Sequence, residues 1–245
     1  MDHSVYEIEA RLVDTHWWFV GRRLLFHKAL KRFHISKKAN ILDVGTSTGA
    51  TIRYFRHRGY QNVSGIEFHE MALDWCHRIG LESVSHGDIR AIPHPDSEFD
   101  LIIATDVIEH VGEDVDALKE VYRCLAPDGY ALITVPAFMF LWGEMDELSH
   151  HKRRYLMKDL RQKAELAGLN VKEMFYFNFI LFPLIAIVRM MARSIKNEIS
   201  RNENEMMGPY INKVLAWIFK LDVLIARFLY IPFGVSIFMM AQKTK

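Results

Sequence analysis

The chain has 245 residues, half of them hydrophobic, and its 31 lysines and arginines nearly balance its 30 aspartates and glutamates. Its two cysteines exclude a disulfide-stapled secreted fold and make a reducing compartment the default, so we predict a cytoplasmic location. The length suits one large α/β domain, or a core with a small appendage.

The N-terminal segment places aromatic and basic residues ahead of an amphipathic helix. The run from His16 to Arg23 reads HWWFVGRR, and apolar residues at helical spacing follow it. The paired tryptophans either close a binding site or are buried as part of the core. Arg22 and Arg23 are suited to bind a carboxylate or an anionic substrate.

The next segment predicts a nucleotide-binding turn. An apolar strand containing Asp43 ends at Val44 and is followed by Gly45 and Gly49, the pattern of a buried strand that enters a tight turn before a helix. The amides of such a turn lie at a positive helix N-terminus. Glu67 ends the next apolar run, at a spacing from which a carboxylate binds a ribose diol.

Two nucleotide cofactors fit this unit. A dinucleotide fingerprint, G-x-G-x-x-G, would need glycines at positions 47 and 50, where the chain has Ser47 and Ala50. Alanine is an accepted variant at the second position, but Ser47 would deprive a pyrophosphate of its close approach to the backbone. A nicotinamide-dependent oxidoreductase is therefore the less favoured alternative.

Strands and helices alternate along the chain, which favours a parallel sheet covered on both faces. The predicted strands are 40–44, 63–67, 83–87, 99–104, 130–135, 171–177 and 234–241. The predicted helices are 49–58, 69–79 and 113–125. Ligands of such sheets bind beyond the carboxyl ends of the strands. Four acids fall at these ends and are expected to face one crevice: Asp43, Glu67, Asp88 and Asp106.

A loop of mixed charge follows the strand at 130–135. It runs from Glu144 to Tyr155 and reads EMDELSHHKRRY. Because loops on rigid scaffolds carry specificity, we expect this one to hold an acidic or phosphorylated acceptor; the alternative is a solvated loop. A metal site built from Asp146, His150 and His151 matches no standard ligand spacing, so no metal is predicted.

The two parts of the chain differ in charge. Residues 1–149 hold 15 basic and 23 acidic residues, whereas residues 150–245 hold 16 basic and 7 acidic ones. The segment 178–232 is apolar but interrupted by prolines and charges, so it does not predict a transmembrane helix. Three basic residues recur every seven positions within it, Lys213, Lys220 and Arg227. This segment either makes peripheral contact with an anionic membrane or packs on the sheet or a second subunit; basic residues interleaved with aliphatic ones argue against nucleic acid.

The motifs, taken in chain order, resemble those of class I S-adenosylmethionine-dependent methyltransferases. Asp43, Gly45 and Gly49 match motif I, with Ser47 in place of the middle glycine. Gly87-Asp88-Ile89 is similar to the acid after strand 3, and 99–110 is similar to motif IV. The collinear match covers about residues 10–180 and most resembles the ubiquinone-biosynthesis type.

The resemblance implies a Rossmann-like, doubly wound α/β sheet of seven strands, mostly parallel with an antiparallel C-terminal strand, and helices on both faces. It implies a single methyltransferase domain over 1–245, with an N-terminal lid helix in 1–36 and an apolar, basic helical insertion at 178–232. The implied cofactor is S-adenosyl-L-methionine, with S-adenosyl-L-homocysteine as product. Its implied contacts are Asp43, Gly45, Thr46, Ser47, Gly49, Glu67, Phe68, Asp88, Ile89, Asp106 and Val107.

The resemblance also implies methyl transfer to oxygen or carbon of a small or amphipathic, lipid-like acceptor. A similar His-x-Arg-Arg-Tyr signature occurs in bacterial methyltransferases of this type. The implied acceptor contacts are Trp18, Arg22, His150, His151, Arg153, Arg154 and Tyr155. A histidine suits a general base, so His110 and His151 are the catalytic candidates, although His110 could instead order its loop. A binding protein of the same fold without turnover is a further alternative, and the oligomeric state stays open.

Overall fold

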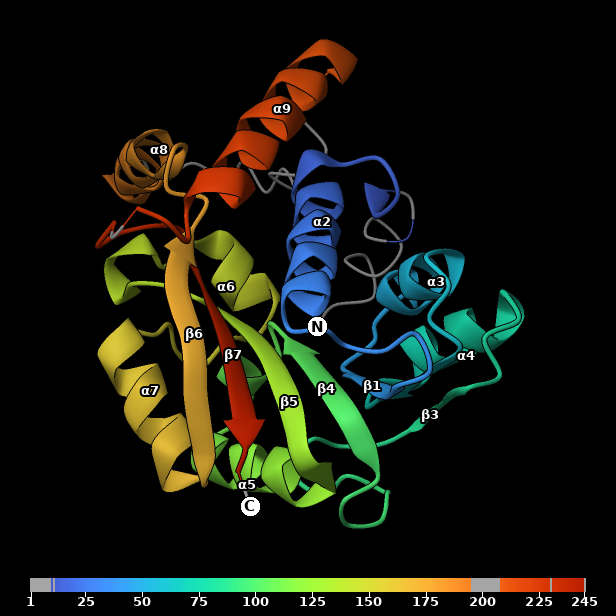
Figure 1. The fold of residues 1–245 in the computed structure, drawn as a ribbon. Helices are drawn as coiled ribbons and strands as arrows, with labels where there is room; N and C mark the ends of the chain where they lie inside the picture. The colour runs from blue at the N-terminus through green and yellow to red at the C-terminus, as the bar shows by residue number, and fades with distance from the viewer. Residues whose placement is uncertain (1–9, 11, 195–207, 230, 245) are drawn as a thin grey trace.

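Seven strands form one sheet in the order β3-β2-β1-β4-β5-β7-β6 in the computed structural model, which describes residues 10, 12–194, 208–229 and 231–244 (Figure 1). The strands are β1 (Asn40–Val44), β2 (Asn62–Glu67), β3 (Val84–His86), β4 (Phe99–Thr105), β5 (Leu125–Pro136), β6 (Leu169–Phe177) and β7 (Ser236–Lys243). Strand β7 pairs antiparallel with β5 and β6, and the other pairings are parallel. The predicted fold class is confirmed.

Helices cover both faces because successive residues of each central strand point to opposite sides. Ile102 and Ile133 pack into the core on one face, and their neighbours Leu101 and Leu132 pack into the core on the other. The first face is covered by α5 (Asp114–Cys124) and α7 (Met157–Leu166). The second is covered by α2 (Trp17–Arg32), α3 (Ala50–His57), α4 (Glu70–Arg78) and α9 (Pro209–Ile225).

The predicted elements agree with the observed ones to within one or two residues, except where tertiary pairing decides their length. Strand β5 begins at Leu125 rather than 130, because Leu125 pairs with Phe99 before a shift in register that brings Tyr130 opposite Leu101. Two helices went unpredicted, the short α6 (Glu144–Leu148) and α7. Within 178–232 the structure has α8 (Phe182–Ser194) and α9.

Helix α9 crosses α2 closely enough to require a glycine. A Cβ on Gly21 would overlap the Phe219 ring, at 1.6 Å from its Cδ1. The rings of Trp17 and Trp18 each lie 5.5 Å from that of Phe219, so the paired tryptophans are part of this contact. Helix α2, which corresponds to the predicted lid helix, is therefore held between the sheet and α9.

In the described ranges, no helix combines the length and the apolar character that crossing a membrane requires.

Candidate functional site

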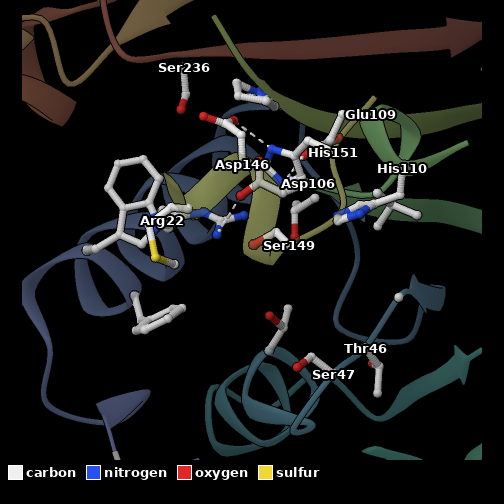
Figure 2. Close-up of a pocket in the computed structure, with 18 of the residues that line it drawn as sticks. Arg22, Thr46, Ser47, Asp106, Glu109, His110, Asp146, Ser149, His151 and Ser236 are labelled. Carbon is white, nitrogen blue, oxygen red and sulfur yellow. Dashed lines mark hydrogen bonds and ion pairs between the residues drawn. The ribbon is translucent and has the colours of Figure 1, made fainter. Parts of the chain in front are cut away.

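A cavity of about 970 Å³ lies at the carboxyl ends of β1, β2 and β4 (Figure 2). We call the lining residues in 43–51, 67–69 and 87–90 the floor of the cavity. We call the lining residues of α2, of 105–111, of 145–154 and of α8 its roof. In Figure 2, Thr46 and Ser47 lie on one side of the cavity and the labelled residues from 106 to 151 lie across from them.

The turn between β1 and α3 brings backbone amides to the floor. Gly45, Ser47 and Gly49 have φ angles of 67°, 51° and 72°. A Cβ on Gly45 would lie 2.7 Å from Val107 Cγ2, so this position needs glycine. The amide of Ser47 donates to Glu67 Oε2 at 2.8 Å, and a second amide, two residues after Glu67, donates to Oε1 at 2.9 Å. Glu67 is thus a fixed, buried carboxylate. Each of its oxygens has one more lone pair, and these two lone pairs suit the two hydroxyls of a ribose.

Asp43 stabilises the turn between β1 and α3 through a hydrogen bond. It is buried, and it accepts a hydrogen bond from Thr46 Oγ1 at 2.6 Å. Burial raises the pKa of Asp43 to about 7. The hydroxyls of Ser47 and Thr48 are buried without a hydrogen-bond partner among the described residues. The turn therefore holds unsatisfied polar atoms where a nucleoside cofactor would lie, which fits a ligand of that kind.

An aromatic ring and an acid mark the far end of the floor. The Phe68 side chain is 50% exposed, whereas Ile89, which also lines the cavity, is buried. Asp88 Oδ2 accepts from Arg90 Nε at 2.9 Å, and this bonding lowers the pKa of Asp88. A half-exposed aromatic ring, next to an apolar side chain and a carboxylate, suits an adenine and its amino group. Because Arg90 already pairs with Asp88, only the remaining lone pairs of the carboxylate can accept from that amino group.

An ion pair joins the roof to the strand ends. Arg22 of α2 lies with Nη1 2.8 Å from Asp106 Oδ2, and its Nη2 donates to Thr134 Oγ1 at 3.3 Å. Thr134 in turn donates to Asp106 Oδ1 at 3.1 Å. The guanidinium also lies 5.5 Å from the centre of the Trp18 ring. Asp106, with a φ of 56°, is therefore held at the tip of β4 by side chains from two elements, α2 and β5.

The roof contains an aspartate–histidine pair. His151 Nδ1 lies 2.8 Å from Asp146 Oδ1, and Arg154 donates to both oxygens of the same carboxylate, through Nε at 2.9 Å and Nη2 at 2.8 Å. Burial alone would raise the pKa of Asp146, but these hydrogen bonds lower it to about 2. Because an ionised carboxylate only accepts, His151 carries its hydrogen on Nδ1. Its Nε2 is then the ring nitrogen that can accept a proton in the cavity.

A second acid lies next to this pair. Glu109 is completely buried, lines the cavity, and has no hydrogen-bond partner for either oxygen among the described residues. Burial, and then the charge of Asp106, raise the pKa of Glu109 well above its ordinary value. The rings of His110 and His151 lie 4.7 Å apart, and burial, followed by the charge of His151, lowers the pKa of His110 to about 4. His110 is therefore neutral near pH 7.

These residues could also hold a metal ion. One donor atom each from Glu109, His110 and His151 lie within 4.8 Å of one another. This cluster differs from the set considered from the sequence, which was Asp146, His150 and His151. In the structure Asp146 instead binds His151 and Arg154, so it supports one member of the cluster from outside it.

Most of the residues predicted for the site line one cavity, and three do not. Gly49 is the N-cap of α3 and acts through the turn. Arg153 donates to Asp114 Oδ2 at 2.8 Å, and the buried Tyr155 hydroxyl donates to the same oxygen at 2.8 Å. Asp114 begins α5, so these two side chains attach the loop to that helix instead of facing an acceptor.

The placement of the other predicted residues refines their roles. Arg154 lines the cavity, but its guanidinium binds Asp146. His150 lines the cavity with a φ of 55°. Two site residues were not predicted from the sequence, Glu109 and, as the partner of a histidine, Asp146. The sequence does contain a signal for each of them: Glu109 directly precedes His110, and Asp146 lies five residues before His151.

The chain is similar in sequence to known methyltransferases. Residues 42–133 match the methyltransferase domain family. The chain is 28% identical to the malonyl-[acyl-carrier protein] O-methyltransferase of Enterobacter lignolyticus, over 57% of each chain. It is 23% identical to a probable S-adenosylmethionine-dependent methyltransferase of Mycolicibacterium smegmatis, over 66% of this chain and 63% of that one. A demethylmenaquinone methyltransferase of Listeria monocytogenes is 27% identical over 42% of this chain and 46% of its own. The chain thus spans less than two thirds of these curated relatives.

Solved structures agree on the fold. A putative sarcosine dimethylglycine methyltransferase from Galdieria sulphuraria superposes with a TM-score of 0.62 over 92% of this chain and 86% of its own, at 16% identity. A putative methyltransferase in complex with the Haloferax volcanii Trm112 activator gives 0.65 over 99% and 95%, at 16% identity. The [4+2]-cyclase SpnF gives 0.60 over 91% and 81%, at 18% identity. At these identities the likeness concerns the fold alone.

Proposed function

The chain belongs to the class I S-adenosylmethionine-dependent methyltransferases, and we propose that it transfers the methyl group of this cofactor to an oxygen atom of an amphipathic acceptor. The observation that carries the choice of oxygen is the Asp146–His151 pair beside the cavity. Transfer to carbon needs no such base, and it remains the second candidate among the acceptor chemistries expected from the sequence.

The floor would hold the cofactor. Glu67 would accept from the ribose hydroxyls, Phe68 and Ile89 would contact the adenine, and the buried hydroxyls of Ser47 and Thr48 would gain partners. When bound, the cofactor supplies an activated methyl group on a sulfonium. Arg22, paired with Asp106, keeps α2 over the strand ends, so that these side chains and the roof face the same space.

The roof would act on the acceptor. His151 Nε2 would take the proton of the acceptor hydroxyl as the methyl group passes from the sulfonium to the acceptor oxygen, with S-adenosylhomocysteine as the leaving group. Asp146 would stabilise the imidazolium that results, through the Nδ1 hydrogen bond of 2.8 Å. His110, with its pKa lowered to about 4, is a poorer base near pH 7 than an ordinary histidine. We therefore favour His151 over His110 for this role.

The walls of the cavity support an acceptor with an apolar part. Trp17, Trp18, Leu184 and Val188 line the roof side together with the cationic Lys152. Two of the relatives are named for their acceptors, a demethylmenaquinone and a malonyl-[acyl-carrier protein]. A nicotinamide-dependent oxidoreductase, the less favoured alternative of the sequence, gains no support from any of these relatives.

Calorimetric titration with S-adenosylmethionine, S-adenosylhomocysteine and NADH tests the cofactor. We expect micromolar binding of the first two and none of NADH. Binding of NADH alone would overturn the proposal. Binding of the first two without methyl transfer to oxygen or to carbon of the acceptors tested would instead support a binding protein that lacks turnover.

A further inference from the structure

Helices α8 and α9 expose an unusual amount of apolar surface. Figure 1 shows both helices at the end of the molecule beyond β6 and β7. The apolar side chains exposed on them range from 39% for Leu221 to 83% for Tyr210. On α8 they are Leu184, Ile187, Val188, Met190 and Met191, and on α9 they are Tyr210, Ile211, Val214, Trp217, Leu221 and Leu224. Single exposed apolar residues are ordinary, but a set this large on two helices marks an interaction surface.

The exposed residues of α9 form one face of the helix. Five of them recur at alternating intervals of four and three residues, which aligns them along the helix: Tyr210, Val214, Trp217, Leu221 and Leu224. Phe219 and Val223 point the other way, into the core. Packing thus already satisfies the inner face of α9, and the outer apolar row needs a different partner.

The charges beside this row have one sign. Lys213 and Lys220, and Arg227 just after the helix, are exposed along one flank of the apolar row. The only acid in α9 is Asp222, and it is completely buried. The described part of α8 contains no acid. An apolar row with tryptophan and tyrosine, flanked on the described part of α9 by exposed cations, is complementary to an anionic lipid surface. Two copies of this face would instead bring cations together.

The two helices form a rigid platform. Asp222 accepts hydrogen bonds from the amides of Asn178, Phe179 and Ile180, directly before α8, at 2.7, 2.7 and 3.0 Å. Three backbone bonds to one buried carboxylate fix the start of α8 against α9. The chain that enters α8 is therefore fixed to α9.

The platform is continuous with the cavity. Leu184 and Val188 of α8 are both more than half exposed and also line the cavity. Arg189 of the same helix donates to the carbonyl of Leu141 at 2.7 Å and lies 3.5 Å from Asp146 Oδ2. Leu184 and Val188 therefore connect the exposed surface with the cavity that Asp146 and His151 also line.

We propose that the α8–α9 face docks on an anionic lipid bilayer and that the cavity draws its acceptor from that bilayer, so that the acceptor is a lipid-soluble molecule with a hydroxyl group. The proposed docking depends only on the exposed apolar and cationic residues of α8 and α9, whereas the proposed acceptor class rests on the proposed methyl transfer. The two parts can therefore fail separately.

Vesicle co-sedimentation tests the docking. The full chain should sediment with vesicles of phosphatidylglycerol and phosphatidylcholine, and not with phosphatidylcholine alone. Trp217→Glu should abolish binding, and Lys220→Gln should weaken it about fivefold, the effect of one cation near an anionic surface. Leu166→Glu is the matched control, because Leu166 on α7 is 64% exposed and Trp217 is 66% exposed. Equal binding by the two glutamate variants, or a dimer that buries the face without vesicle binding, would overturn the docking.

Methyl transfer tests the acceptor class. With methyl-labelled S-adenosylmethionine and a lipid extract of the source organism, label should enter the organic phase with the wild-type chain. It should not enter with His151→Ala, and Trp217→Glu should lower its rate without changing cofactor affinity. Label confined to aqueous products would overturn a lipid-soluble acceptor. A chain that binds vesicles but not S-adenosylmethionine would keep the docking and refute the proposed function.

Discussion

The floor of the cavity is made from residues close in sequence, whereas its roof is assembled across most of the chain. On the floor, Ser47 and Glu67 are bonded across 20 positions. In the roof, Arg22 reaches Thr134 across 112 positions, and the amide of Trp17 donates to Asn212 across 195. Local motifs therefore identify the cofactor side of the site, and long-range packing decides the acceptor side.

The largest expected effect tests the roof. We expect His151→Ala to lower kcat by about 10²–10⁴-fold, the usual contribution of a general base, with the affinity for S-adenosylmethionine unchanged. His110→Ala should cost less if His151 is the base. Steady-state kinetics with titration of the cofactor separates the two effects. A larger loss for His110→Ala would reverse the assignment.

The next effect concerns the stability of the roof. Asp146→Ala removes the carboxylate from the buried Arg154 and should lower the free energy of unfolding by about 3–5 kcal/mol. Asp116→Ala, which breaks the exposed pair with Lys119, should cost no more than about 1 kcal/mol. Urea denaturation measures both. Similar values for the two variants would mean that Asp146 does not hold the roof together.

On the floor, Glu67→Ala should weaken S-adenosylmethionine binding by about 1.5–3 kcal/mol, the scale of hydrogen bonds to a charged group. Glu70→Ala, three residues on and exposed, serves as the control and should leave the affinity unchanged. Calorimetry gives both values. An unchanged affinity for the Glu67 variant would remove this residue from the ribose role.

The last prediction concerns the pH dependence of the floor. Asp43 keeps its proton up to about pH 7 in the folded chain and loses it near its ordinary pKa of 3.8 when unfolded. The folded state thus binds more protons between these values, so stability should fall as pH rises from 4 to 7, by at most about 1.4 kcal/mol per pH unit. Asp43→Asn should flatten this dependence. Denaturation at pH 5 and 7 measures it, and an equal slope in the variant would assign the dependence to other groups.

The predictions from the sequence succeed on the floor and fail in part in the roof. The strands, their alternation with helices and the glycine turn were predictable because each depends on local periodicity and backbone conformation. Arg153 and Tyr155 were expected at the acceptor, but both bind Asp114 at the start of α5. Nothing in their spacing distinguishes a side chain that faces a ligand from one that attaches its loop to a helix.

The sequence by itself determined the α/β fold, the turn at Gly45 and the acids that end β1 and β2, because strand periodicity and positive φ angles are local properties of the chain. Only the tertiary structure brought Asp146 to His151, buried Glu109 beside His110, and turned one row of α9 outward while Phe219 packed against α2. Burial and partner choice depend on which distant segments meet, and those contacts set the charge states at the roof and the apolar surface that stays exposed on α9.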